Sequence, residues 1–197
     1  MNGKYKMLNR IVKKLTLLIS FYSIILTCSA EEVSLGKIDA PVTIIEYGSI
    51  TCDYCIHFHR KVLPNIKASY IDTGKVRFIY RHFPTSEPAL QAAIAAQCSG
   101  GKYYEMLDRL YLSTADWLQA DNRNQIFVKQ ANSLGIDSAL FSRCLNDKKQ
   151  RENIIVQQRE ASEKYDVIGT PTFIINNKVI SGKTTFSEME SILNKML

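Results

Sequence analysis

Residues 42–55 read VTIIEYGSITCDYC, an apolar stretch that ends in two cysteines separated by two residues. The length of the segment 42–49 and its β-branched side chains predict a largely buried strand. Helical sequence follows over about 52–70, and Pro64 should kink that helix. The cysteine pair therefore lies where a strand passes into a helix.

Downstream of this unit, the sequence pattern predicts further strands and helices. Apolar runs rich in β-branched residues predict strands over 76–81, 172–177 and 178–181, and helical periodicity predicts helices over 148–166 and 187–197. From Ala89 onward, four segments have helical periodicity and few strand formers, which indicates an inserted helical module. The predicted fold class is α/β, with a central mixed sheet flanked by helices and interrupted by an all-helical insertion.

The first 30 residues have the pattern of an export signal. Five basic residues precede the apolar run Leu15–Leu26, and small residues up to Ala30 follow it. This run is shorter than the roughly 20 residues that span a bilayer, so we expect a signal peptide over 1–30, cleaved after Ala30, and a periplasmic protein. Two alternatives are an uncleaved leader that anchors the chain in the inner membrane and a lipid attached to Cys28.

The leader also accounts for the net charge of the chain. The whole sequence has 25 Lys and Arg residues against 19 Asp and Glu residues, and removal of the leader leaves 20 against 19. A chain with nearly balanced charge lacks the electrostatic attraction that nucleic acids require. We therefore expect no nucleic-acid partner.

The position of the two cysteines suggests redox chemistry. Cys52 should lie at a helix N-terminus, where free backbone N–H groups and the helix dipole stabilise a thiolate. Cys55, one turn later, should face inward and act as the resolving thiol. A short C-x-x-C loop gains little stability from a permanent bridge. Asp53, next to the nucleophile, should disfavour the thiolate if its carboxyl is ionised nearby.

A structural bridge or half of a metal site is the alternative for the cysteine pair. His57 and His59 are close in sequence, but both lie on the same short segment as the cysteines, without the spacer that lets ligands converge on zinc. Attachment of c-type haem needs a histidine directly after the second cysteine, and Ile56 stands there. We therefore expect neither a metal nor a cofactor, and we interpret both histidines as packing or helix-surface residues.

Two further cysteines lie in the helical module. Cys98 and Cys144 each follow an apolar residue by four positions, so each lies on an apolar helix face. Because only two residues separate Cys52 from Cys55 and export favours disulfides, Cys98 and Cys144 can form a structural disulfide with each other. The alternative is two unpaired buried thiols. Trp117 and the stripe Tyr103, Tyr104 and Tyr111 are expected to form the core of the module.

Taken together, the segments TCDYC, RHFP, the helix ending at Cys98, FSRCL and IGTPTFIIN resemble the DsbA-like thiol-disulfide oxidoreductases of bacteria. The resemblance covers Ser34 to Leu197. It implies a thioredoxin-like fold with a helical insertion, divided into residues 31–85 with the C-x-x-C pair, 86–150 as the helical insertion, and 151–197 with a cis-proline loop.

The resemblance also implies roles for individual residues. Pro171 would be cis, and with Thr170 it would bind substrate beside the cysteine pair. Asp53 and Tyr54, between the two cysteines, are also expected to contact substrate. Glu46 would be a buried carboxylate that exchanges protons with Cys55; the alternative is a strand residue that faces solvent. The expected activity is disulfide formation. The alternatives are a reductase or isomerase of the same fold and, from a different class, a non-catalytic periplasmic protein that binds a metal or thiols.

The same resemblance suggests the partners. Exported proteins with free thiols would be the substrates, and an inner-membrane quinone-linked protein would reoxidise the cysteine pair. Only about ten residues separate Glu31 from Pro41, too few for the N-terminal dimerisation domain of dimeric isomerases, so we expect a monomer.

Overall fold

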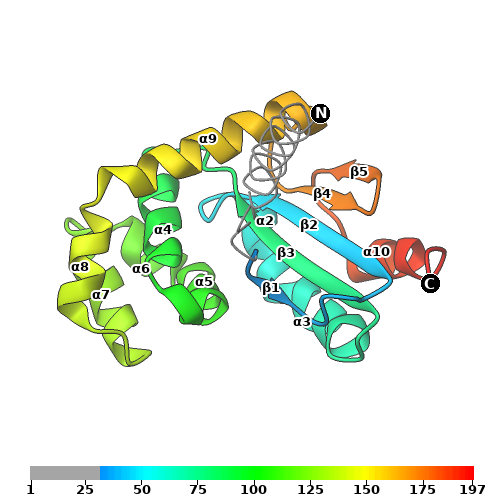
Figure 1. Ribbon diagram of the computed structural model, residues 1–197, viewed down its shortest axis with the longest axis horizontal. Helices are drawn as coiled ribbons and strands as arrows, with labels where there is room; N and C mark the ends of the chain where they lie inside the picture. The colour runs from blue at the N-terminus through cyan, green and yellow to red at the C-terminus, as the bar shows by residue number, and fades with distance from the viewer. Residues whose placement is uncertain (1–31) are drawn as a thin grey trace, which may run out of the picture. The chain divides into compact units, whose positions relative to one another are not determined.

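Five strands form the centre of the molecule. The computed structural model, shown in Figure 1, describes residues 32–197. The strands are β1 (Ser34–Leu35), β2 (Val42–Gly48), β3 (Val76–His82), β4 (Thr172–Ile175) and β5 (Lys178–Ser181). They form one sheet in the order β1-β3-β2-β4-β5, in which β2 and β3 are parallel and the other pairs antiparallel. The signal peptide expected over residues 1–30, with its cleavage after Ala30, lies outside the described residues.

Helices flank the sheet and fill the segment between β3 and β4. The first helical run consists of α2 (Asp53–His57), the π-helical η1 (Phe58–Val62), α3 (Leu63–Ile66) and the π-helical η2 (Lys67–Ile71). The inserted helices are α4 (Glu87–Gln97), the 3₁₀ turn η3 (Gly100–Lys102), α5 (Tyr103–Leu112), α6 (Thr114–Leu118), α7 (Arg123–Ser133) and α8 (Ser138–Leu145). The last two helices are α9 (Lys148–Tyr165) and α10 (Phe186–Leu193).

This architecture confirms the predicted fold class. The mixed sheet is flanked by helices, and the block α4–α8 interrupts the chain between β3 and α9, to the left of the sheet in Figure 1. Within residues 32–197, no helix has both the length and the apolar character that crossing a lipid bilayer requires.

The largest differences between the structure and the predicted elements are in three places. The helix after the cysteine pair continues to Ile71 and contains two π-helical segments, one of them directly before α3, which has Pro64 in its first turn. Proline lacks an amide hydrogen, and the wider π turn accommodates the missing bond without ending the helix. Strand β1 was not predicted, because its two residues are too few to show alternation in the sequence. The final helix ends at Leu193 rather than Leu197.

One hydrophobic core extends from the sheet into the helical block. Phe58 on η1, Phe78 on β3 and Tyr111 on α5 belong to the same buried cluster, which continues to Trp117 and Phe127. Burial of the tyrosine stripe and of Trp117 is as predicted, but Tyr103 and Tyr104 also hydrogen-bond to the backbone of β3. The shared core therefore fixes α5 against the helix that follows the cysteine pair.

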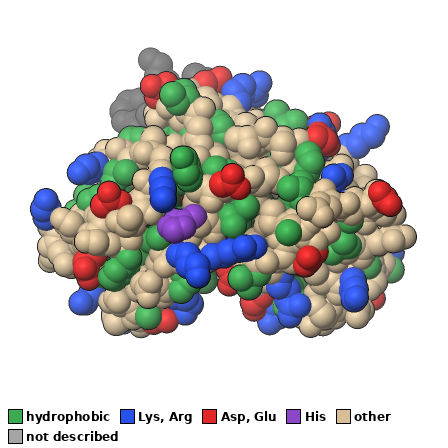
Figure 2. All heavy atoms as spheres, turned by 180° about the vertical axis from the view of Figure 1, so that it is seen from behind, with side chains coloured by type: hydrophobic (Ala, Val, Ile, Leu, Met, Phe, Trp, Pro, Cys, Tyr) green, Lys and Arg blue, Asp and Glu red, His purple; other side chains and the backbone are tan. Residues whose placement is uncertain are grey.

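Charged side chains cover the surface in a mixture of signs. On the face shown in Figure 2, acidic and basic side chains are interspersed, and basic side chains gather above a notch at the lower edge. This mixture agrees with the nearly balanced charge of the chain after its first 30 residues.

Candidate active site

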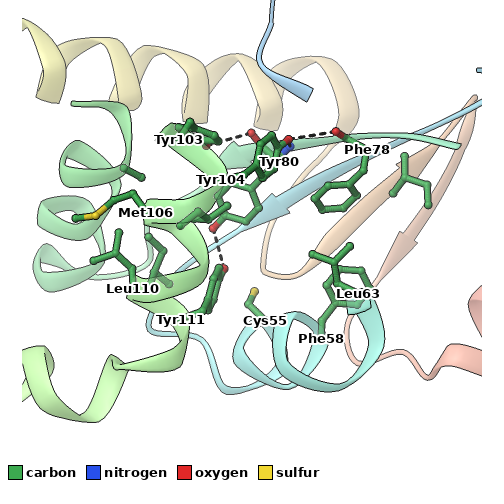
Figure 3. Packing of buried hydrophobic residues seen from close by; sticks show 14 of the residues in the cluster. Cys55, Phe58, Leu63, Phe78, Tyr80, Tyr103, Tyr104, Met106, Leu110 and Tyr111 are labelled. Carbon is green, nitrogen blue, oxygen red and sulfur yellow. Dashed lines mark hydrogen bonds between the residues drawn. The ribbon is translucent and has the colours of Figure 1, made fainter. Parts of the chain in front are cut away.

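The two cysteines lie at the start of the helical run that follows β2. Cys52 is the N-cap of α2 and is partly exposed, whereas Cys55, one turn later, is fully buried, and both thiols are free. In Figure 3 the side chain of Cys55 projects from its helix into the core, where Tyr111 of α5 faces it. The Cys52 thiol is therefore accessible to another molecule, whereas the Cys55 thiol can exchange disulfides only with Cys52.

A loop distant in sequence closes over the first thiol. The peptide bond between Thr170 and Pro171 is cis, and the Cys52 thiol donates a hydrogen bond of 3.2 Å to the Thr170 carbonyl oxygen. Pro171 is buried, while Thr170 is half-buried. The loop is thus in direct contact with Cys52, although 118 positions separate the bonded residues.

The surroundings of Cys52 favour its ionised form. A hydrogen bond from the Cys55 thiol lowers the pKa of Cys52 to about 5, with further help from Thr170 and from the backbone N–H groups of Cys55 and Tyr54. Partial burial opposes this shift. A thiol with this pKa is almost entirely thiolate at neutral pH, and the thiolate is the form that attacks disulfides.

The surroundings of Cys55 have the opposite effect. Burial raises the pKa of the Cys55 thiol far above its usual value, and the hydrogen bond to Cys52 and the negative charge of Glu46 raise it further. A thiol of this kind keeps its proton unless a base takes it. The pair therefore combines one ionised, partly exposed sulfur with one protonated, buried sulfur.

Glu46 on β2 is completely buried and points into the core rather than to solvent. Its Oε2 lies 2.9 Å from Nε2 of His59, while its Oε1 has no hydrogen-bond partner within the described residues. Burial raises the pKa of the Glu46 carboxyl, and His59 partly counteracts that shift. A carboxyl whose pKa is raised by burial holds its proton more readily than an exposed one, so Glu46 can act as a proton donor.

His59 is the site residue that sequence reasoning missed. It was interpreted as a packing or surface residue, and its ring does pack on Tyr111, with the ring centroids 3.9 Å apart. However, it also bonds to Glu46, so it belongs to the buried polar group behind the cysteines. The signal was its position four residues after Cys55, which places both side chains on the inner face of one helix.

The other predicted site residues lie on the surface or away from the pair. Asp53 and Tyr54 are exposed in the first turn of α2, between the two cysteines. Cys98 and Cys144 are joined by a disulfide that connects the end of α4 to α8, with a Cα–Cα distance of 5.7 Å. In the described part of the chain, no three metal-binding side chains come together.

A comparison with protein families identifies this arrangement. The sequence model of the thioredoxin family matches residues 29–195. The chain belongs to the thioredoxin family. The match includes the cysteine pair, the helical block and the cis-proline loop, which are the parts that build the site.

Solved structures match the fold over most of the chain. Alpha-DsbA1 from Wolbachia pipientis is 29% identical, with a TM-score of 0.77 over 85% of this chain and 91% of that chain. BdbD from Bacillus subtilis has the same fold, with a TM-score of 0.72 at 24% identity over 84% of this chain and 92% of that chain. The predicted resemblance to DsbA-like proteins is confirmed.

The curated relatives within the thioredoxin family are longer than this chain. A Rickettsia felis protein with the provisional name protein-disulfide oxidoreductase is 27% identical over 168 residues, which are 84% of this chain and 60% of that protein. A Bacillus cereus protein with the provisional name disulfide bond formation protein D is 26% identical over 83% of this chain and 78% of that protein. The chain therefore spans about three fifths of the Rickettsia relative.

Proposed function

We propose that this thioredoxin-family protein is an exported oxidoreductase that introduces disulfide bonds into client proteins. The observation that carries this proposal is the opposite ionisation of the two thiols, with the pKa of Cys52 near 5 and that of Cys55 raised. A stable thiolate favours the reduced pair over the disulfide, which makes the disulfide form a good oxidant. The names of the relatives support the same direction.

The reaction begins with the Cys52–Cys55 disulfide. A client thiolate attacks the sulfur of Cys52, the bond between the two cysteines breaks, and its electron pair passes to the sulfur of Cys55, which takes up a proton. A second client thiolate then attacks the client sulfur of this mixed disulfide and releases Cys52 as a thiolate. Two electrons have moved from client to protein, and the client has gained one disulfide.

The surrounding residues have distinct parts in this proposal. Glu46 exchanges the proton of Cys55, because its negative charge acts on that thiol from within the core. Thr170 and Pro171 hold the client chain beside Cys52, where the loop already contacts the sulfur. Asp53 and Tyr54, exposed next to the nucleophile, complete the surface that a client meets.

The proposed location is based on the leader pattern and the second disulfide, and the proposed partners are based on thiol-disulfide exchange at Cys52. The leader pattern of residues 1–30 supports export to the periplasm, and the Cys98–Cys144 disulfide supports an oxidising compartment. Clients are exported proteins with free thiols, and a membrane protein linked to quinones accepts the electrons. The protein acts as a monomer.

Incubation of the oxidised protein with a peptide that has two thiols tests this function. We expect one equivalent of peptide disulfide per protein, with Cys52 and Cys55 becoming reduced, because the thiolate of Cys52 is the better leaving group. Mass spectrometry after alkylation of free thiols measures both products. Failure of the disulfide form to oxidise the peptide, together with reduction of a peptide disulfide by the dithiol form, would show a reductase instead.

A further inference from the structure

A groove opens on the side of the buried Glu46–His59 pair. Its volume is about 650 Å³, and β1, the helical run around η1 and α3, and helix α5 form its walls. Most of the lining is apolar, including Leu35, Leu63 and Leu112. Among its polar members are His59 and Asp108, so the groove connects the back of the active site with the surface.

The imidazole of His59 separates the groove from Glu46. Its Nε2 bonds to the Glu46 carboxyl, while its Nδ1 is buried and has no hydrogen-bond partner within residues 32–197. Tyr111 stacks on one face of the ring, with 14° between the ring planes, and Tyr80 meets it edge-on. These rings hold the imidazole in place, with Nε2 facing the Glu46 carboxyl and Nδ1 pointing away from it.

Asp108 is the acidic group of the groove wall that interacts with His59. It lies on α5, one turn before the residue that stacks on the imidazole. Partial burial raises the pKa of the Asp108 carboxyl, and the charge of His59 acts in the opposite direction. Both side chains line the groove, and their charges interact across it.

We propose that this groove is the route by which the proton exchanged at Cys55 passes between Glu46 and water, with His59 and Asp108 as the groups that carry it. This inference rests on the proposed function and adds the path that the proton follows. When the Cys52–Cys55 bond breaks, Cys55 takes the proton of Glu46, and Nε2 of His59 restores it. Asp108, through a water in the groove, protonates Nδ1 as Nε2 gives up its proton, so that the ring stays neutral, and Asp108 takes a proton from solvent in turn. One proton therefore enters for each disulfide reduced.

An imidazole suits this task because one nitrogen can accept a proton while the other releases one. A glutamine could donate to Glu46 in the same way but could not pass a proton on. The titratable groups that interact with His59 are Glu46, Tyr80, Asp108 and Tyr111, and those that line the groove beside it are Arg60, Lys67, Tyr103 and Glu105. Of these, Asp108 is the carboxyl whose charge interacts with His59 from the groove side.

Reduction of the Cys52–Cys55 disulfide by dithiothreitol tests the route without any client. We expect His59→Gln to slow this reduction about 10- to 100-fold, Asp108→Asn to slow it about tenfold, and both losses to grow as pH rises from 6 to 9. Asp116→Asn, which removes an exposed carboxyl of α6 outside the groove lining, is the matched control and should react at the wild-type rate. Added imidazole should restore the rate of His59→Ala in proportion to its concentration.

Two further measurements distinguish proton transfer by His59 from a purely structural role. The midpoint for alkylation of Cys52 in His59→Gln should match the wild type, which shows that the thiolate site is intact. Wild-type rates in His59→Gln across the pH range, or no effect of imidazole on His59→Ala, would overturn the proton role of His59. A wild-type rate in Asp108→Asn would overturn the groove as the route. Failure of the proposed function would instead appear as no peptide oxidation by the wild type.

Discussion

Cys52→Ser should abolish oxidation of a dithiol peptide, with a loss of at least about 1000-fold. The hydroxyl of serine neither ionises near neutral pH nor forms a disulfide, so the electrons have no entry point. Cys52 is the accessible sulfur of the pair, and Cys55, which is fully buried, cannot replace it. Single-turnover oxidation of the peptide, followed by mass spectrometry, measures this loss.

Cys55→Ser is the matched control, because it keeps the nucleophile and removes the resolving thiol. After reaction with an activated peptide disulfide, this variant should accumulate a stable mixed disulfide at Cys52, since no neighbouring thiol can release the peptide. The mass of the adduct and its site by peptide mapping identify it. An adduct at Cys55 in Cys52→Ser, formed at a comparable rate, would reverse the two roles.

Cys98→Ala/Cys144→Ala should lower the free energy of unfolding by about 4 kcal/mol on the chain-entropy estimate. The disulfide joins residues 46 positions apart, and it closes most of the helical block from the end of α4 to α8. For a domain of this size, such a loss lowers the melting temperature by roughly 10 °C. Urea unfolding of the purified double variant measures it.

The control for this prediction is the Cys52→Ser/Cys55→Ser variant, compared with reduced wild type. It removes the same number of cysteines but leaves the structural disulfide, so at pH 4, where the Cys52 thiolate no longer contributes, its stability should lie close to that of the wild type. A double alanine variant that unfolds at the wild-type urea concentration would show that the Cys98–Cys144 bridge does not stabilise the helical block.

The sequence predicted those parts of the molecule that depend on local patterns. Strand β2 ends at Gly48, one residue before the predicted limit of 49, and strand β5 has the predicted bounds, 178–181. The C-x-x-C pair identified the nucleophile because its position between strand and helix is a local property. Strand β1 was missed because two residues carry no periodic signal.

The proton-exchanging part of the site depends on contacts between distant segments. Glu46 and His59 lie on different elements, and the ring that stacks on His59 comes from α5 in the inserted block. No spacing within one segment shows that these three side chains meet. The resemblance to DsbA-like proteins suggested the role of Glu46, but the groove and the unpartnered nitrogen of His59 became visible only in the folded chain.

The lowered pKa of Cys52 also links the redox pair to folding. Because the pKa in the folded protein is about 5 and that of an ordinary thiol is 9.0, ionisation stabilises the reduced folded protein. This contribution is complete above about pH 9 and is lost as the pH falls through about 5. The disulfide form has no such contribution, since neither sulfur titrates.

The rate of alkylation of Cys52 by iodoacetamide as a function of pH tests the central claim most directly. In the reduced wild type, followed by peptide mass mapping, the rate at Cys52 should rise with a midpoint near pH 5, while Cys55 stays unmodified up to pH 9. A midpoint near pH 9 at Cys52, or modification of Cys55 before Cys52, would contradict the account.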